Sequence, residues 1–263
     1  MVEVQTYPTV GEAASAMDDQ ARFLGGGTLI MNRVNYGDRR FSRIVRTTDA
    51  SLSEIRVEGE RLEVGAGVTM AAILASRDLD FLSPAARAVG GPAIRNMASV
   101  GGNLMAPHPY GDLAVALLAL DAIVRMVSGE ELSLEDFLAR RNGVVRSLLI
   151  RRPRSDEFRF KKVSRVKPKG VSVMSMAARL TRSTGRLSGV RVAYGAMAPT
   201  PVRVRAVENA LEGVSLDHAG IAAALSAATE GLDPPDDPIA SGWYRREVAP
   251  VHLRRLLLGE DAR

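Results

Sequence analysis

Two glycine-rich turns constrain the fold of this chain more than any other feature. The first is Gly25-Gly26-Gly27-Thr28, directly after the apolar stretch 21–24, and the second is Gly101-Gly102 within Ser99 to Asn103. Glycine lacks a Cβ, so such turns let backbone N–H groups approach a ligand and form nests for phosphate. Neither turn fits GxGxxG or GxxxxGK[ST], which disfavours a Rossmann fold. The pair suits a pyrophosphate, and two plain tight turns are the alternative.

Composition excludes several functions and leaves others open. The chain has 263 residues, 46% of them hydrophobic, which suffices for two domains with sizeable cores. It contains no cysteine, which excludes disulfides, iron–sulfur ligation and thiolate zinc sites within it. The net charge of +5 suits an anionic cofactor, an acidic partner or nucleic acid. The densest basic cluster, Arg151, Arg152 and Arg154, contains no aromatic residue, which disfavours nucleic acid.

No pattern of catalytic or metal-ligating residues is visible. His108, His218 and His252 are far apart in the sequence, and the carboxylates show no metal-ligand spacing. There is no GxSxG elbow and no cysteine nucleophile, so hydrolase chemistry is disfavoured. We therefore expect no catalytic side chain and no metal ion, and any redox activity requires a bound cofactor.

The N-terminus and the longest apolar run bear on location. The first ten residues lack the basic start and apolar stretch of a secretory signal, which predicts a cytoplasmic protein. The longest apolar run, 113–120, is far shorter than the roughly 20 residues of a membrane span. We expect this run to form a buried helix, with Asp112 as its N-cap.

Hydrophobic periodicity predicts alternating strands and helices. In the first part, the pattern predicts strands at 2–7, 21–24, 44–46, 122–127 and 148–150, a hairpin around Glu58-Gly59-Glu60, and helices at 10–17, 69–75, after Pro84, through Arg95, and at 134–138. In the second part, it predicts strands at 159–163, 171–180 and 187–194 and helices at 202–211, 217–230 and 243–258. The polar stretch after Arg151 predicts a domain boundary near Arg152.

Four segments together resemble one family, the FAD-binding subunits of molybdenum hydroxylases of the xanthine and carbon monoxide dehydrogenase type. They are the loop 25–28, the stretch AIRNMASVGGNLMAPHPYGDLAVALLALDA at 93–122, the stretch FKKVSRVKPKGVSVMSMAARL at 160–180 with its continuation, and the terminal helix with Tyr244-Arg245-Arg246. The stretch 93–122 is the most specific. Read from residues alone, the terminal helix is an amphipathic docking element whose arginines bind carbonyls or acidic neighbours.

The resemblance implies an α+β fold. It would comprise a two-subdomain FAD-binding domain of the PCMH type (vanillyl-alcohol oxidase-like) at 1–152, divided into about 1–55 and 56–152. A C-terminal domain at 153–263, like that of the carbon monoxide dehydrogenase flavoprotein, would follow with an antiparallel sheet.

The resemblance also implies a set of FAD-binding residues, in which backbone amides of both loops hold the pyrophosphate and the basic position near the flavin is Lys162 or its neighbour Lys161. The expected residues are Leu24, Gly25, Gly26, Gly27, Thr28, Leu29, Ser99, Val100, Gly101, Gly102, Asn103, His108, Tyr110, Asp112 and Lys162. Leu29 stands where relatives often carry Asp, Glu or Ser, and His108 where they usually carry Ser. From the residues alone, Lys162 is also interpretable as a solvated strand lysine and Tyr110 as a core or rim tyrosine.

The implied function is electron transfer. A molybdopterin-binding large subunit and a 2Fe-2S small subunit would supply electrons, and FAD on this chain would pass them to NAD⁺, oxygen or another acceptor. Two alternatives stay open: a stand-alone FAD-dependent reductase or oxidase, and a flavin-free scaffold subunit. Colour and FAD binding distinguish the last from the others.

Overall fold

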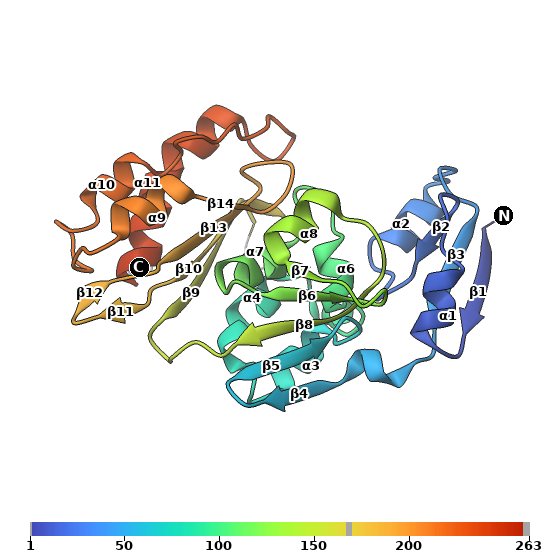
Figure 1. The fold of residues 1–263 in the computed structure, drawn as a ribbon. Helices are drawn as coiled ribbons and strands as arrows, with labels where there is room; N and C mark the ends of the chain where they lie inside the picture. Colours follow the sequence, from blue (N-terminus) through green and yellow to red (C-terminus); the bar gives the residue numbers. More distant parts are fainter. Residues whose placement is uncertain (1, 167–169, 260–263) are drawn as a thin grey trace.

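The computed structural model describes residues 2–166 and 170–259, and these form an α+β protein whose three main sheets follow one another along the chain (Figure 1). The N-terminal segment lies at one side, the C-terminal helices at the other, and a five-stranded sheet lies between them. The predicted fold class is confirmed.

The first unit is a small parallel sheet. Its strands β1 (Glu3–Tyr7), β3 (Arg43–Thr47) and β2 (Ala21–Phe23) lie in the order β1-β3-β2. Helix α1 (Val10–Ser15) begins with a capping box between Thr9 and Glu12. Helix α2 (Ile30–Asn35) follows the first glycine loop, where the sequence predicted no helix. Parallel pairing places the ends of β1 and β2 at the same sheet edge.

The second unit is an antiparallel sheet in the order β4-β5-β8-β6-β7. The strands are β4 (Ile55–Glu58), β5 (Arg61–Gly65), β6 (Ile123–Met126), β7 (Glu131–Ser133) and β8 (Val145–Arg151). The predicted hairpin is confirmed, with Gly59 at φ 61° in its turn. The accompanying helices are α3 (Met70–Ala75), α4 (Ser83–Ala88), α5 (Pro92–Arg95), α6 (Val100–Leu104) and α8 (Leu134–Arg140), with 3₁₀ turns at Ala50–Ser53 and Asp80–Leu82.

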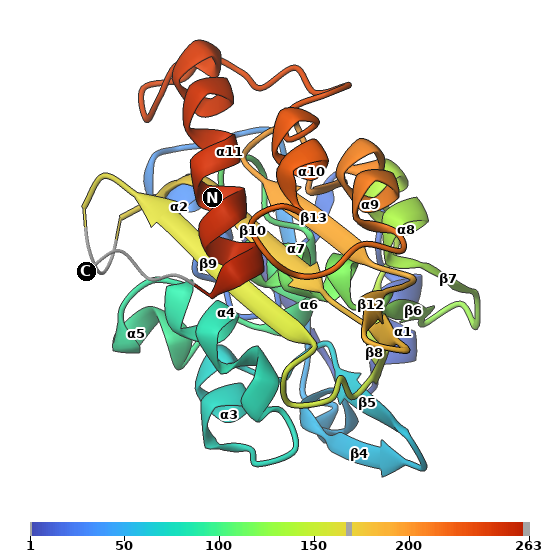
Figure 2. The same ribbon diagram turned by 90° about the vertical axis from the view of Figure 1, so that its left-hand side faces the viewer.

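The third unit is an antiparallel sheet in the order β14-β13-β10-β9. Its strands are β9 (Phe158–Ser164), β10 (Ser172–Arg179), β13 (Arg191–Gly195) and β14 (Val202–Arg203), with a short hairpin of β11 (Arg182–Ser183) and β12 (Arg186–Leu187) beside it. Helices α9 (Arg205–Leu211), α10 (Ala222–Ser226) and α11 (Gly242–Leu258) lie over one face of this sheet (Figure 2).

Helix α7 (Asp112–Ala119) joins the second and third units. All eight of its residues are buried, as predicted for the apolar run. The helix packs against β10 and β13 on the face opposite α11, and the same apolar core contains Leu148 of the five-stranded sheet and Ala177 of β10. We propose the domain boundary near Arg152, in the connection between β8 and β9. Helix α7 lies before this boundary and packs on strands β10 and β13, which follow it.

Three predicted elements were wrong in extent. The strand predicted at 187–194 is interrupted because Gly189, at φ 63°, turns the chain between β12 and β13. The helix predicted at 202–211 begins only at Arg205, because residues 202–203 pair with β13 as strand β14. The helix predicted at 217–230 is regular only over α10, within a series of turns. The other predicted elements agree within a few residues at each end.

Candidate functional site

The first glycine loop continues from the end of β2. The amide of Leu24 donates to the Val45 carbonyl oxygen at 2.7 Å, which extends the β2–β3 ladder by one residue. The chain then turns through Gly25 and Gly26 to Gly27, whose φ of 73° lies in the left-handed region that favours glycine. Thr28 and Leu29 lead directly into α2.

The two glycine loops contact one another. The Gly26 amide donates to Ser99 Oγ at 3.3 Å. A Cβ on Gly25 would lie 2.7 Å from Ser99 Oγ, and a Cβ on Gly26 would lie 1.6 Å from the Met97 carbonyl oxygen. These glycines are therefore required for the first loop to pack against the segment that leads into the second.

The amides of the first loop are open donors. Within residues 2–166 and 170–259, the backbone N–H groups of Gly25, Gly27 and Thr28 donate to no protein acceptor. Unpaired N–H groups next to one another in a glycine turn make a concave anion site. This donor set fits a pyrophosphate.

The second loop differs from the prediction of a strand-adjacent turn, because it is the first turn of helix α6. Ser99 is the N-cap, and its Oγ accepts from the Gly102 amide at 3.2 Å. The amides of Val100 and Gly101 donate to the carbonyl oxygens of Val68 and Ala66. These donors are thus paired with protein acceptors, and the open amides lie in the first loop.

Asn103 links this short helix to α7. Its Oδ1 accepts from the Ala114 amide at 3.0 Å, and the Asn103 side chain is buried. Ala114 lies in the first turn of α7, whose early amides have no partner within the helix. Asn103 therefore holds the start of α7 against α6.

The prediction that Asp112 is the N-cap of α7 was wrong. Gly111, with φ 103°, occupies that position, and no side chain caps the helix. The Asp112 carboxylate instead accepts from Lys162 Nζ at 2.9 Å and from Ser172 Oγ at 2.6 Å. Lys162 also donates to the Ala88 carbonyl oxygen at 2.8 Å, and its side chain is 13% exposed. Lys162 is therefore not a solvated strand lysine.

His108 joins a second network that reaches α11. Its Nε2 lies 2.7 Å from Asp237 Oδ2, which also accepts from the Arg245 guanidinium at 2.7 Å. Arg245 is fully buried and donates to the carbonyl oxygens of Val173, Pro235 and Ala240. The prediction that arginines of the terminal helix bind carbonyls and acidic neighbours is confirmed for Arg245.

The surroundings of Asp237 in this network favour the ionised form of its carboxyl group. Burial raises the pKa of Asp237, but hydrogen bonds from His108, from the amides of Ala240 and Ile239, and from Arg245 outweigh burial. The net effect holds the pKa of Asp237 well below its ordinary value.

Comparison with known proteins places the chain in a family. Residues 2–148, more than half of the chain, match the family described as the FAD binding domain in molybdopterin dehydrogenase. The chain belongs to this family. Residues 158–259 match the carbon monoxide dehydrogenase flavoprotein C-terminal domain. The chain is thus an FAD-binding subunit of the molybdenum hydroxylase family, an oxidoreductase whose cofactor is FAD.

Individual relatives cover nearly the whole chain. The 6-hydroxypseudooxynicotine dehydrogenase complex subunit alpha of Paenarthrobacter nicotinovorans is 28% identical over 257 residues, which is 91% of this chain and 86% of the relative. The carbon monoxide dehydrogenase medium chain of Hydrogenophaga pseudoflava is 24% identical and covers 99% and 97%. In fold, the reconstituted carbon monoxide dehydrogenase of Oligotropha carboxidovorans superposes with a TM-score of 0.89 at 22% identity, over 98% of this chain and 96% of that one.

Two other predicted FAD-binding residues, Leu29 and Tyr110, follow the two glycine loops in the sequence. Leu29 is half-buried at the start of α2 and makes no side-chain cap. Tyr110 is 47% exposed, and its amide donates to the Pro107 carbonyl oxygen in the loop between α6 and α7. Met31, Met97 and Met105 also expose apolar surface near the loops.

Sequence reasoning missed two residues that hold predicted site residues in place. Ser172 holds Asp112, and its position in an apolar strand gives no signal of that role. Asp237 links His108 to Arg245 from a proline-containing loop, where an isolated aspartate is also inconspicuous. Arg245 carried a signal, because it belongs to the quoted Tyr244-Arg245-Arg246 motif.

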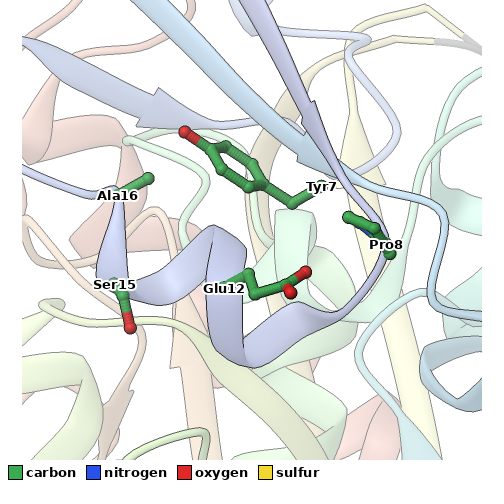
Figure 3. Close-up of a pocket in the computed structure, with 5 residues that line it drawn as sticks. All are labelled: Tyr7, Pro8, Glu12, Ser15 and Ala16. Carbon is green, nitrogen blue, oxygen red and sulfur yellow. The ribbon is translucent and has the colours of Figure 1, made fainter.

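An open depression elsewhere in the flavoprotein is unrelated to these residues. Tyr7, Pro8, Glu12, Ser15 and Ala16 line it beside α1 (Figure 3). None of the predicted FAD-binding residues is among them, and Glu12 is already engaged as the capping-box partner of Thr9. We therefore assign it no role in FAD binding.

Residues 2–166 and 170–259 contain neither an evident metal site nor a helix that could span a membrane. No cluster of three or more His, Asp or Glu side chains suited to a metal ion occurs in this part of the chain. None of the helices described there is both long and apolar enough to cross a membrane.

Proposed function

We propose that this chain is the FAD-carrying electron-transfer subunit of a multi-subunit molybdenum hydroxylase. It would receive electrons from a 2Fe-2S small subunit, downstream of a molybdopterin-binding large subunit, and pass them to NAD⁺, oxygen or another acceptor. Relatives named as a medium chain and as a subunit of a dehydrogenase complex support this assignment. The absence of cysteine in the chain also supports it, because any iron–sulfur cluster must be held elsewhere.

The open amides of the first loop carry the proposal. Gly25, Gly27 and Thr28 would donate to the FAD pyrophosphate, while Gly26 holds the loop on Ser99. Leu24 and Leu29 flank these donors. FAD supplies the electron-accepting and electron-donating chemistry when bound, and the protein holds and orients it.

The other proposed residues would complete and position the cofactor site. Ser99, Val100, Gly101, Gly102 and Asn103 would present the start of α6 beside the first loop. His108, Tyr110, Asp112 and Lys162 would border it on the side of the C-terminal sheet. Because Asp112 and Lys162 neutralise one another, their proposed role is to fix the geometry of this border.

FAD titration tests the cofactor site directly. Purified protein should quench FAD fluorescence with saturable binding. Gly25→Val should weaken this binding at least about tenfold, since the new side chain meets Ser99 Oγ and forces the first loop away from the second. Gly11→Ala is a matched control, because a Cβ at Gly11 has no neighbour closer than 3.9 Å. Equal FAD binding by Gly25→Val and wild type would refute an FAD pyrophosphate site at the first glycine loop.

Coexpression tests the partners. With the two expected partner subunits, the chain should copurify as a complex containing FAD, molybdopterin and iron. A folded protein that never binds FAD, alone or in a complex, would favour the flavin-free scaffold. A monomer that binds FAD and reduces an acceptor from a soluble donor would favour the stand-alone reductase or oxidase.

A further inference from the structure

A small cavity with several charged side chains in its lining lies where the five-stranded sheet meets β10, and no residue of the glycine loops lines it. It has a volume of about 160 Å³. Leu120 and Leu149 form part of its apolar lining, and Arg61, Arg151, Arg179 and Asp121 supply its charged groups. None of the proposed FAD-binding residues lines it. The cavity is therefore a separate site with three guanidinium groups and one carboxylate.

Two of these arginines face one another across neighbouring strands. Arg61 of β5 and Arg151 of β8 are directly paired in the antiparallel register, which places their side chains on the same face. Like charges in this arrangement destabilise a sheet. Arg151 is paired with Glu60, but both side chains are mostly exposed, and Arg61 has no ion pair or side-chain hydrogen bond within the described part of the chain. Such exposed pairs neutralise little.

The third arginine has an unused donor. Arg179 donates through its terminal nitrogen to Asp121 Oδ2 at 2.7 Å, but its Nε is buried and has no acceptor. Asp121 is shared, since Arg191 lies 2.9 Å and Arg203 3.4 Å from its carboxylate. Asp121, at the wall of this cavity, is thus shared by three arginines, of which only Arg179 lines the cavity. Arg179 therefore keeps hydrogen-bonding capacity that the protein does not use, and a buried donor left unpaired is costly.

We propose that this cavity binds a small oxyanion of the size of phosphate. Such an ion would lie between the guanidinium groups of Arg61, Arg151 and Arg179 and separate the like charges of β5 and β8. Guanidinium groups match the oxygen spacing of phosphate and bind it through paired hydrogen bonds. The inference does not depend on the proposed electron-transfer role.

Arg61→Gln provides the cleanest test, because Arg61 has no described side-chain partner to lose and the variant should fold as the wild type does. Binding of inorganic phosphate is measured by calorimetry in FAD-saturated protein, with chloride at matched ionic strength as the reference. We expect saturable binding by the wild type and roughly fivefold weaker binding by Arg61→Gln. Arg179→Gln should also weaken phosphate binding, because it removes another guanidinium group from the wall of the cavity.

Arg56→Gln is the matched control. Arg56 lies on the adjacent strand β4, is 59% exposed and pairs with Glu54. The Arg56→Gln variant should bind phosphate as the wild type does. Phosphate bound at the glycine loops would be insensitive to Arg61→Gln, because Arg61 lies at the opposite end of β5 from the Ala66 contact with Gly101. No phosphate-specific binding, or binding by Arg61→Gln within twofold of wild type, would overturn the proposal.

Discussion

Lys162 Nζ lies 2.9 Å from Asp112 Oδ2, and this pair joins β9 to the first turn of α7. The side chains are 13% and 8% exposed. Ser172 Oγ also donates to the Asp112 carboxylate, and Lys162 Nζ also donates to the Ala88 carbonyl oxygen. This well-hydrogen-bonded pair holds the C-terminal sheet in a fixed position against the FAD-binding domain.

Removing one member of this pair should destabilise the protein strongly. Lys162→Met leaves the Asp112 carboxylate buried without its counter-charge, and we expect a loss of about 3 kcal/mol. Urea denaturation measures the change. Arg56→Gln, which breaks an exposed pair with Glu54, should cost at most about 1 kcal/mol. A loss for Lys162→Met no larger than that of the control would contradict a structural role for the pair.

Gly26→Ala should lower stability and FAD affinity together. Its Cβ would lie 1.6 Å from the Met97 carbonyl oxygen, so the backbone of one loop must move. Overpacking of this kind costs about 1–3 kcal/mol. Thermal denaturation and FAD titration of the same sample measure both effects, and unchanged values for both would show that the loops do not pack as described.

Asn103→Leu should destabilise the start of α7. The substitution keeps a side chain of similar size but removes the Oδ1 acceptor, which leaves the buried Ala114 amide unpaired. An unsatisfied buried donor costs about 1–3 kcal/mol. Hydrogen exchange should show faster exchange at Ala114 in the variant. Exchange as slow as in the wild type would mean that another acceptor takes the place of Asn103.

Acid should weaken the link between His108 and α11. Because the pKa of Asp237 is lowered in the folded protein, its ionised form stabilises the fold. That contribution is complete above the ordinary carboxyl pKa of about 4 and is lost as the pH falls through the lowered folded value. Asp237→Asn should therefore be less stable than wild type near neutral pH, and the difference should narrow below about pH 4.

Chemical denaturation across this pH range measures the effect. His108→Gln serves as a comparison, since it can keep a hydrogen-bond donor next to Asp237 and leaves the carboxylate in place. A constant difference in stability between wild type and Asp237→Asn at all pH values would exclude Asp237 as the titrating group.

Local sequence signals predicted much of the fold. The turn Glu58-Gly59-Glu60 predicted its hairpin, and Thr69 predicted the start of α3, where its hydroxyl accepts from the Ala72 amide. These features depend on residues within a few positions. The two glycine loops were also predicted to act together, and the Gly26–Ser99 hydrogen bond places them in contact.

Features that depend on distant partners were not predictable in the same way. Asp112 fits the pattern of an N-cap, but its carboxylate instead binds Lys162, which is 50 residues away in the sequence. The sequence around His108 does not indicate its contact with Asp237, because Asp237 is 129 residues away in the sequence. The second loop resembled a turn because its helix, α6, is only five residues long and begins with two glycines after Val100.

The complete burial of α7 has a consequence for how the chain is made. The helix is synthesised before β10 and β13, the strands that cover one of its faces. During translation, the face of α7 that packs on these two strands therefore stays uncovered until at least Gly195 has left the ribosome. Folding of the N-terminal part is completed only by sequence that follows it, so a nascent chain stopped near Arg152 should recruit chaperones that a longer one does not.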